Sequence, residues 1–348
     1  MRSLGAVLAL LLLIAVLVAM LAGCPAKPKP SETTPTTPPR QPQDSTAPTQ
    51  PETSATLEPP KEPPGGWKKY RLAATLLTRK HQFYNDLEAM LKETAAKYNA
   101  TVDIQSSEFQ SARQRDQVEN FIVGKYDAII VCPADSDSVG GAIRLANDAH
   151  IPVFTADIAA NQGDVVCHVA SDNVQGGRLA GECLAKLLGG QGDVLIIDHP
   201  TVTSVQDRTQ GFEEAIAKYP EMRIVDRPAA DGQRVKAQQK TQTALLANPN
   251  LRGIFGINDD SALGALAALR QAKREDIVIV GYDATPEARK EILVGSSLKA
   301  DVVQHPKDIA RLTIEAVVTY LNGGRAPQKV PVPVAVVDQE SLSKEPKA

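Results

Sequence analysis

Polar side chains of the kinds that bind sugar hydroxyls stand directly beyond several apolar, strand-like runs of this chain. Asp157, Asn258 and Asp283 each follow such a run, and Arg208 follows another after a loop. A sugar hydroxyl that leaves water needs both a donor and an acceptor, and an unpaired buried polar group costs about 1–3 kcal/mol. Because ligands of open α/β sheets sit beyond the carboxyl ends of the strands, this placement predicts a polyol-binding site.

Aromatic residues make up only 4% of the chain, and two of them stand together after the first apolar run. Phe83 and Tyr84 follow the polar segment 78–82. Aromatic rings can cover the C–H faces of a sugar ring. The pair is therefore a candidate for one wall of the site.

Plainer structural roles remain open for the same polar residues. Asp259 and Asp260 are placed to cap the helix expected after them. Asn258 suits turn chemistry, and Asp283 suits an Asx turn. Arg208 on an amphipathic helix would ordinarily be solvated, and only its position facing a loop favours a binding role.

Catalytic motifs are absent from the sequence. It has no GxSxG elbow, HExxH or P-loop, and the glycine-rich segment 189–193 is typical of a helix-to-strand turn. Asp157 and Asp283 could form the acid–base pair of a glycosidase, but neither has a local feature that would raise its pKa. We therefore predict a binding protein without catalytic residues or cofactor.

Besides Cys24, the chain has three cysteines, Cys132, Cys167 and Cys183, with no CxxC spacing. We expect buried free thiols, and a Cys132–Cys167 disulfide stays open as an alternative. Cys167 and His168 are adjacent, but neighbouring residues of a strand point to opposite faces. No metal site is predicted.

The N-terminus is an apolar run, residues 4–22, that ends in Leu21-Ala22-Gly23-Cys24. A positive start, an apolar core and small residues before the cleavage point are typical of a secretory signal. With cysteine at that point, residues 1–23 resemble a bacterial lipoprotein signal peptide, which implies lipid attachment to Cys24. A membrane-spanning anchor is the alternative, since about 19 apolar residues can cross a bilayer. Both place the remainder outside the cytoplasm, held at a membrane.

Residues 24–66 are predicted to form a disordered tether. Of the 25 prolines, 13 lie in this segment among Thr, Ser and Gln, with hardly an apolar residue to build a core. The rest of the chain is long enough for two lobes. The net charge of -3 and the lack of a basic stripe argue against nucleic acid as a partner.

The body alternates apolar runs with amphipathic patterns, which indicates parallel sheets covered by helices. Two doubly wound α/β lobes fit this many strands, and a single (β/α)₈ barrel is the alternative. Strands are expected at 71–77, 101–105, 128–131, 153–155, 165–169, 194–197, 223–225, 253–257, 277–280, 298–303 and 330–337, and helices at 83–97, 139–149, 177–188, 208–218, 235–246, 262–269 and 309–321.

From Arg71 to Val337 the body resembles the ribose-binding type of periplasmic sugar-binding protein, which serves ABC importers. The resemblance rests on several short motifs in order: Pro133-Ala134-Asp135-Ser136-Asp137-Ser138-Val139, Ile151-Pro152-Val153 leading to Asp157, Val169-Ala170-Ser171-Asp172-Asn173-Val174-Gln175-Gly176-Gly177, Asp207-Arg208 with Gly211-Phe212, Asn258-Asp259 with Ala262-Leu263-Gly264-Ala265, and Gly281-Tyr282-Asp283-Ala284-Thr285-Pro286.

The resemblance implies two Rossmann-like lobes joined by three crossing segments, with a cleft that closes over one sugar. The first lobe would comprise residues 67–170 and 304–326, and the second 171–303 and 327–340. The ligand contacts that it implies are the aromatic pair Phe83 and Tyr84 and the polar residues Asp157, Arg208, Asn258, Asp283 and Gln304, with His81 and Tyr282 as weaker candidates.

This chain departs from the pattern of the ribose binders at several cleft positions. Their arginine after the aspartate is Ile158 here, and their aromatic residue from the second lobe is Gly232. Leu77 stands where they have a serine, and His81-Gln82 where they have an asparagine. Losing a guanidinium removes several fixed donors. A sugar or polyol therefore stays the expected ligand, without ribose being singled out.

The resemblance implies a monomeric, extracytoplasmic, lipid-anchored protein that hands a sugar or polyol to an ABC permease. The alternative from another class is a sugar-sensing co-receptor for a membrane histidine kinase or chemoreceptor. Both uses would read the surfaces of the closed lobes, so the sequence leaves this choice open.

Overall fold

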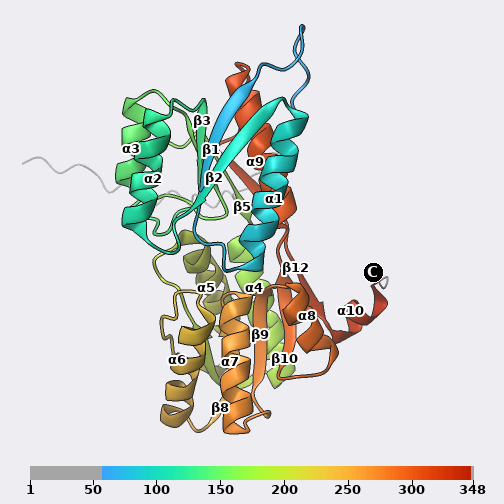
Figure 1. Ribbon diagram of the computed structural model, residues 1–348. Helices are drawn as coiled ribbons and strands as arrows, with labels where there is room; N and C mark the ends of the chain where they lie inside the picture. The colour runs from blue at the N-terminus through green and yellow to red at the C-terminus, as the bar shows by residue number, and fades with distance from the viewer. Residues whose placement is uncertain (1–56, 346–348) are drawn as a thin grey trace, which may run out of the picture. The chain divides into compact units, whose positions relative to one another are not determined.

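The computed structural model describes residues 57–345, which contain two six-stranded sheets flanked by helices (Figure 1). The signal peptide, Cys24 and most of the tether predicted from the sequence lie outside the described residues. Within the described part of the chain, none of the helices combines the length and apolar character that crossing a membrane requires.

The sheet of the first lobe has the strand order β11-β5-β4-β3-β1-β2, and all of its pairs are parallel. Its strands are β1 (Tyr70–Leu76), β2 (Ala100–Ser106), β3 (Ala128–Val131), β4 (Val153–Ala156), β5 (Cys167–Ser171) and β11 (Lys329–Val332).

Strand alternation divides the core of the first lobe between the two faces of its sheet. Leu72 and Ile130 pack with α1 and α9, while Ala73 and Ile129 pack with α2 and α3 on the other face (Figure 1). Successive strand residues point to opposite faces, so a sheet covered on both sides needs continuous apolar runs. The helices are α1 (Gln82–Lys97), α2 (Ser111–Val123), α3 (Gly140–Asp148) and α9 (Pro306–Leu321).

The sheet of the second lobe has the order β12-β10-β9-β8-β6-β7 and is parallel except for the β10–β12 pair. Its strands are β6 (Gln191–Ile197), β7 (Glu221–Asp226), β8 (Leu251–Gly256), β9 (Val278–Asp283), β10 (Leu298–Val303) and β12 (Ala335–Asp338). Helices α4 (Asn173–Leu188) and α5 (Thr203–Ile216) pack together on one face. The other helices of this lobe are α6 (Arg234–Ala247), α7 (Asp259–Ala272), α8 (Pro286–Leu293) and α10 (Gln339–Lys344).

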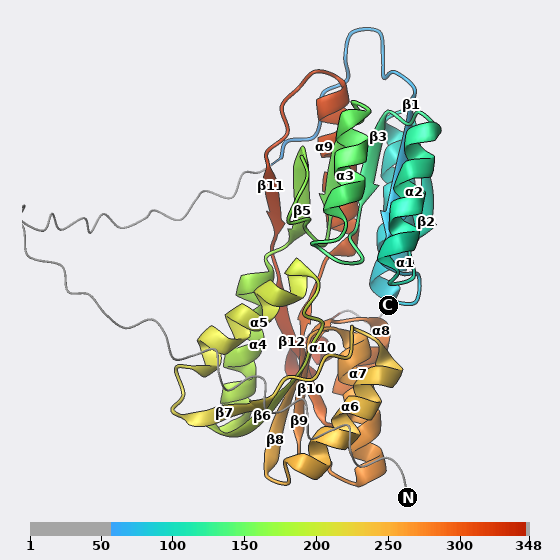
Figure 2. The ribbon, with the colours of Figure 1, turned by 90° about the vertical axis from the view of Figure 1, so that its left-hand side faces the viewer.

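The chain passes between the lobes three times: after β5, after β10, and between β11 and β12. Figure 2 shows β11 and β12 in succession, one in each lobe. The predicted strand 330–337 is therefore two strands, separated at Pro333-Val334. Proline has no N–H to continue a ladder, which explains the break. The assignment of the whole segment 327–340 to the second lobe is thus wrong for β11, which pairs with β5.

The two doubly wound lobes confirm the predicted fold class, and the separate sheets rule out the barrel. The sequence analysis missed α2, α8 and α10. In α2 two of the four buried positions are glutamines, Gln114 and Gln117, which weakens its apolar stripe. Gln114 donates to the Cys132 carbonyl and accepts from the Ala134 amide, and Gln117 accepts from Thr75.

Candidate functional site

A cavity of about 40 Å³ lies where the carboxyl ends of the two sheets meet. Its walls include eight of the nine ligand contacts suggested by the sequence: His81, Phe83, Tyr84, Asp157, Arg208, Asn258, Asp283 and Gln304. The side chains come from both lobes, so a molecule held here would bridge them. That these residues contact a ligand stays a prediction.

The aromatic pair begins α1 and is joined to the aspartate of β4. The rings of Phe83 and Tyr84 are edge to face at 5.2 Å, and the Tyr84 hydroxyl donates to Asp157 Oδ2 at 2.6 Å. Asp157 Oδ1 is buried and has no hydrogen-bond partner within the described protein. Burial raises the pKa of Asp157, although Arg208 and the Tyr84 hydroxyl act in the opposite direction. The cavity thus presents an acceptor with spare capacity for a ligand hydroxyl.

Arg208 is buried and held from three directions. Its Nε donates to Asn173 Oδ1 at 2.9 Å, its Nη1 donates to the Ile257 carbonyl at 2.7 Å, and its guanidinium lies 3.9 Å from the centre of the Tyr282 ring. Tyr282 therefore lies behind Arg208 and does not line the cavity. It supports Arg208 here, and its suggested role as a ligand contact stays a prediction. A guanidinium fixed in this way loses little entropy when it binds a ligand.

Close packing of α4 against α5 and β9 requires two glycines. A Cβ at Gly177 would overlap the Arg208 carbonyl oxygen, and one at Gly176 would overlap the Tyr282 hydroxyl. The motif residues Gly176-Gly177 thus let Tyr282 and the α5 backbone approach closely enough to place Arg208.

A chain of hydrogen bonds links the cavity to two crossing segments. Ser171 donates to Gln304 Oε1 at 2.7 Å, and Gln304 Nε2 donates to Asp283 Oδ1 at 2.6 Å. Gln304 follows β10 and Ser171 ends β5, so the position of Asp283 is coupled to the hinge. Desolvation and the nearby Asp259 carboxylate raise the pKa of Asp283 to about 8. This shift was not predicted from the local sequence around Asp283.

Two further buried carboxylates lie beside Asp283. Asp259 accepts from the Thr285 amide at 2.7 Å, and Asp301 accepts from the Ala284 amide at 3.1 Å. Burial raises the pKa of Asp259, and burial together with Asp259 raises that of Asp301 well above its ordinary value. Like charges in apolar surroundings disfavour ionisation, which is why the pKa values of these carboxyl groups are raised.

Asn258 caps α7 and also lines the cavity. Its Oδ1 accepts from the Ser261 amide at 2.9 Å, which makes it the N-cap of α7, and its Nδ2 donates to the Gly232 carbonyl at 3.2 Å. The capping role proposed for Asp259 and Asp260 therefore belongs to Asn258. The same side chain reaches the cavity wall.

His81 contacts the second lobe across the cleft. Its Nε2 lies 3.6 Å from Asp260 Oδ2, and a Cβ at Gly232 would lie 3.6 Å from its ring. Burial lowers the pKa of His81 and lowers that of His199 to about 4. Both imidazoles are therefore neutral at pH 7 and can each donate and accept. Gly232 has a φ of 65°, in the left-handed region that glycine tolerates.

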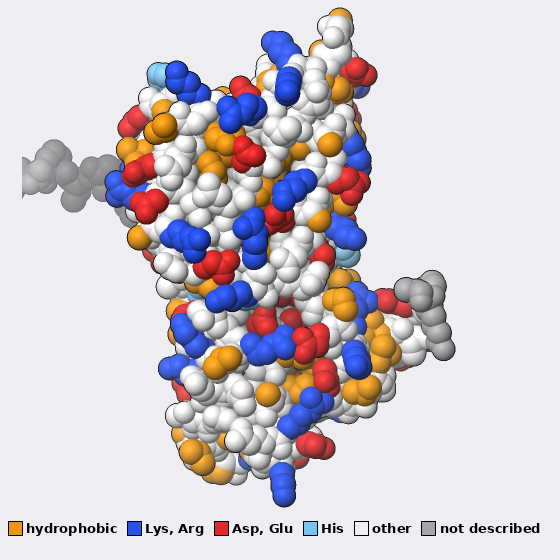
Figure 3. Space-filling view, in the orientation of Figure 1, with side chains coloured by type: hydrophobic (Ala, Val, Ile, Leu, Met, Phe, Trp, Pro, Cys, Tyr) orange, Lys and Arg blue, Asp and Glu red, His pale blue; other side chains and the backbone are white. Residues whose placement is uncertain are grey.

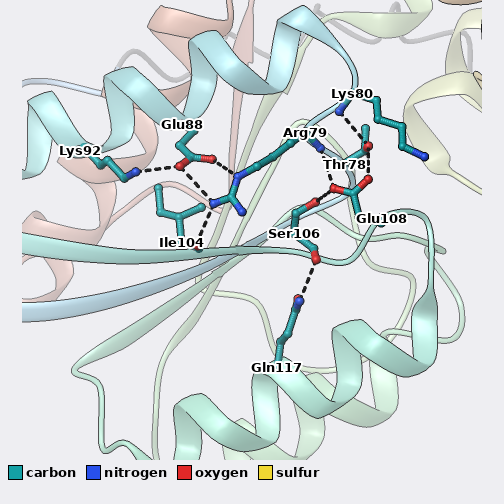
Figure 4. A network of polar contacts seen from close by, with 9 residues as sticks. All are labelled: Thr78, Arg79, Lys80, Glu88, Lys92, Ile104, Ser106, Glu108 and Gln117. Carbon is teal, nitrogen blue, oxygen red and sulfur yellow. Dashed lines mark hydrogen bonds and ion pairs between the residues drawn. The ribbon is translucent and has the colours of Figure 1, made fainter.

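The segment that carries His81 is fixed by a surface network of ion pairs (Figure 4). Arg79 pairs with Glu88 at 2.7 Å and donates to the Ile104 carbonyl at 2.9 Å. Glu108 accepts from the Arg79 amide and from Ser106. These contacts hold residues 78–81 before α1 begins.

Most of the cavity residues that were not predicted as ligand contacts come from the segment after β6 and from the first turn of α5. His199 stands just beyond β6, a position that the rule of polar residues at strand ends could have selected. The helix was expected from residue 208, and α5 begins five residues earlier, at Thr203, which brings its first turn to the cleft. The others are Leu77, Ile158, Val202, Ser204, Val205 and Ile257.

The surface carries charges of both signs, and the described cysteines are unpaired. Figure 3 shows acidic and basic side chains interspersed over the face in view. Cys132, Cys167 and Cys183 are free, so the alternative Cys132–Cys167 disulfide is not formed. Within residues 57–345 no group of three His, Cys, Asp or Glu side chains is arranged to hold a metal ion.

Two α/β lobes that enclose a polar, aromatic cavity at their junction define a two-lobed solute-binding protein. Residues 73–325 match the family model described as "Periplasmic binding protein domain". The ribose import binding protein RbsB of Escherichia coli (strain K12) is 34% identical over 270 residues, which cover 77% of this chain and 90% of that protein. The chain therefore belongs to the periplasmic binding protein family.

Solved structures agree with this assignment. An ABC transporter solute-binding protein from Agrobacterium vitis, bound with alpha-D-tagatopyranose, has a TM-score of 0.76 at 27% identity and covers 79% of this chain and 97% of its own. A periplasmic solute-binding protein from Actinobacillus succinogenes with bound D-allose has a TM-score of 0.74 at 30% identity and covers 80% and 100%. The predicted family is confirmed.

Proposed function

We propose that this chain captures a sugar or polyol between its lobes and presents it, unchanged, to an ABC import permease. The observation that carries the proposal is the convergence of Asp157, Arg208, Asp283 and Gln304 with the aromatic pair in one inter-lobe cavity. Donors, acceptors and a ring-covering surface together match the chemistry of a polyol. As the family resemblance implies, we also propose that the protein acts as a monomer.

Capture proceeds by opening and closing of the lobes about the three crossing segments. A ligand that contacts both lobes shifts the population towards the closed form by its differential affinity for the two forms. Direct contacts across the cleft support a closed state: the Thr203 amide donates to Ser136 Oγ at 3.0 Å, and the Ala159 amide donates to Thr203 Oγ1 at 2.9 Å. A ligand enters when these contacts open.

A thermal-shift screen tests the ligand class, with pentoses, hexoses, inositols, disaccharides and amino acids as probes. A ligand at 100 times its Kd stabilises the native state by about 2.7 kcal/mol. We expect a rise in melting temperature with at least one sugar or polyol. A rise only with amino acids, or with none of the probes, would overturn the proposal. Recovery of the bound sugar in altered form would contradict a purely binding role.

We further propose that Cys24 carries a lipid and that residues 24–66 tether the body outside the cytoplasm. The signal-like run before Cys24 and the proline content of the segment support this. In a bacterial host, labelled fatty acid should enter the wild-type protein and not Cys24→Ser. Equal labelling of both proteins would contradict the anchor.

A further inference from the structure

One side of the cavity is lined by aliphatic side chains from both lobes. Leu77 and Ile158 stand just beyond β1 and β4, and Val202 and Val205 stand at the start of α5. Their exposed fractions are 4%, 2%, 1% and 3%. All four belong to one continuous cluster of buried apolar side chains. The lobes therefore meet around an apolar patch, here called the aliphatic patch.

Hydrogen-bonding groups of the second lobe gather on the other side of the cavity. Asn258, Asp283 and Gln304 follow β8, β9 and β10, which are neighbours in the sheet. Within the second lobe, the patch residues Val202 and Val205 follow β6, on the far side of β8 from β9. His199, although on the β6–α5 segment, points towards Gly232 and Asn258, since a Cβ at Gly232 would lie 3.5 Å from His199 Nδ1 and 3.3 Å from Asn258 Nδ2. Polarity is thus largely segregated across the site, with two exceptions: Ser204 stands between Val202 and Val205, and the aliphatic Ile257 stands beside Asn258.

This segregation restricts what a bound sugar can place against the aliphatic patch. Phe83 and Tyr84 already offer an aromatic surface for a ring face. A hydroxyl held against Leu77, Ile158, Val202 and Val205 would lose water without gaining a partner, whereas a methyl group there gains free energy by burial. An aliphatic surface contributed by both lobes therefore selects a ligand with an apolar edge.

We propose, on the basis of the sugar-binding function proposed above, that the ligand is a deoxysugar whose methyl group sits in the aliphatic patch. Its hydroxyls then face Asn258, Asp283 and Gln304, with Asp157 and Arg208 between the two sides. The structure assigns Ile158 and Val205 as specificity-determining residues, one from each lobe.

The proposed preference for a deoxysugar can be tested by calorimetry on the wild-type protein with matched pairs of sugars that differ by one hydroxyl. Suitable pairs are D-galactose and D-fucose, L-galactose and L-fucose, L-mannose and L-rhamnose, D-glucose and 6-deoxy-D-glucose, and D-ribose and 5-deoxy-D-ribose. Among the pairs that bind, we expect the deoxy member of the tightest-binding pair to have an affinity at least about fivefold higher than that of its hydroxylated partner. This factor corresponds to the lower end of the free-energy cost of an unpaired buried hydroxyl. Tighter binding of the hydroxylated member overturns the deoxysugar assignment alone. Failure of every sugar and polyol to bind overturns the proposed function as well.

Substitutions in the aliphatic patch provide the second measurement. Ile158→Thr and Val205→Thr each place a hydroxyl in the patch, so the preference for the deoxy member should fall at least about threefold. The matched control Val139→Thr changes a buried valine of the first lobe away from the cavity and should keep the wild-type preference. An unchanged preference in both patch variants, with melting temperatures close to that of the control, overturns the assignment of the patch. If a variant does not fold, the affinities of the wild-type protein for the sugar pairs still test the deoxysugar proposal.

Discussion

The two sides of the cleft hold their binding groups in place by different means. In the first lobe, the segment before α1 is held by ion pairs at the surface, in which the Arg79 side chain is 44% exposed. In the second lobe, Arg208, Asp259 and Asp301 are buried and are fixed by hydrogen bonds. Exposed ion pairs contribute little, whereas breaking a buried polar network is costly. Binding should therefore be more sensitive to changes in the second lobe.

The largest effect is expected from Arg208→Ala. The change removes a fixed charge and the side-chain donor to the Ile257 carbonyl, and it leaves Asn173 Oδ1 with the Tyr282 hydroxyl at 3.4 Å. Hydrogen bonds to charged groups contribute about 1.5–3 kcal/mol, so sugar affinity should fall about 10- to 100-fold. Calorimetry on the variant measures this. Arg223→Ala, which removes an exposed guanidinium paired with Asp193, is the control and should bind normally. Wild-type affinity in Arg208→Ala would show that Arg208 does not contact the ligand.

The corresponding change in the first lobe is Asp157→Ala. Sugar affinity should fall at least about tenfold, because Oδ1 is the acceptor left for a ligand hydroxyl. The Tyr84 hydroxyl also loses its acceptor. Tyr84→Phe in the Asp157→Ala background should restore the melting temperature without restoring affinity. This result would distinguish the role of Asp157 in stability from its role in ligand binding. A larger loss of affinity in Asp157→Ala than in Arg208→Ala would reverse the comparison between the lobes.

The buried carboxylates predict a pH dependence that originates in the second lobe. With a pKa of about 8 in the folded protein, against about 4 when unfolded, Asp283 binds more protons in the native state between these values. Its contribution to stability is therefore present at low pH and is lost as the pH rises towards 8. The raised pKa values of Asp259 and Asp301 act in the same direction, whereas Arg208 lowers that of Asp283.

His199 acts oppositely, because its pKa of about 4 lies below the ordinary value of about 6.5, so its contribution is lost as the pH falls through that window. His81, whose pKa is also lowered, acts in the same sense. Above pH 6.5 the carboxylates determine whether stability rises or falls with pH. Stability without ligand should fall from pH 6.5 to 8, by at most about 1.4 kcal/mol per pH unit for each proton. Asp283→Asn should flatten a plot of melting temperature against pH, and Asp116→Asn, on exposed α2, should not. A flat wild-type profile would contradict the raised pKa.

The smallest effect is expected from the surface network of the first lobe. Arg79→Ala removes the pair with Glu88 and should cost less than about 1 kcal/mol of stability, with affinity changed less than about threefold. Raising the salt concentration should reduce even this difference. Lys97→Ala, which breaks an exposed pair with Glu93, is the control. A tenfold loss of affinity in Arg79→Ala would mean that this network places His81 for binding.

Local sequence features predicted most helices and strands, because the pattern that defines each of them lies within a short stretch of chain. The run 128–131 coincides with β3, since this strand is buried along its whole length and reads as an unbroken apolar run. The run 298–303 coincides with β10, although Lys299 and Asp301 interrupt its apolar residues. The pattern failed where buried positions are polar, as in α2. It also failed at Pro333, where one apolar run serves two sheets and only strand pairing shows the division.

The sequence by itself determined the repeating strands and helices and the polar residues beyond the strands, because periodicity and short motifs are local. The family resemblance carried by those motifs implied that the polar residues line one cleft. Only the tertiary structure decided that Tyr282 stands behind Arg208, that Asp259 and Asp301 gather beside Asp283, and that Leu77, Ile158, Val202 and Val205 form one patch. These groups lie far apart in the chain. Their pKa values and their selectivity depend on distance and burial, which exist only once the lobes have folded and met.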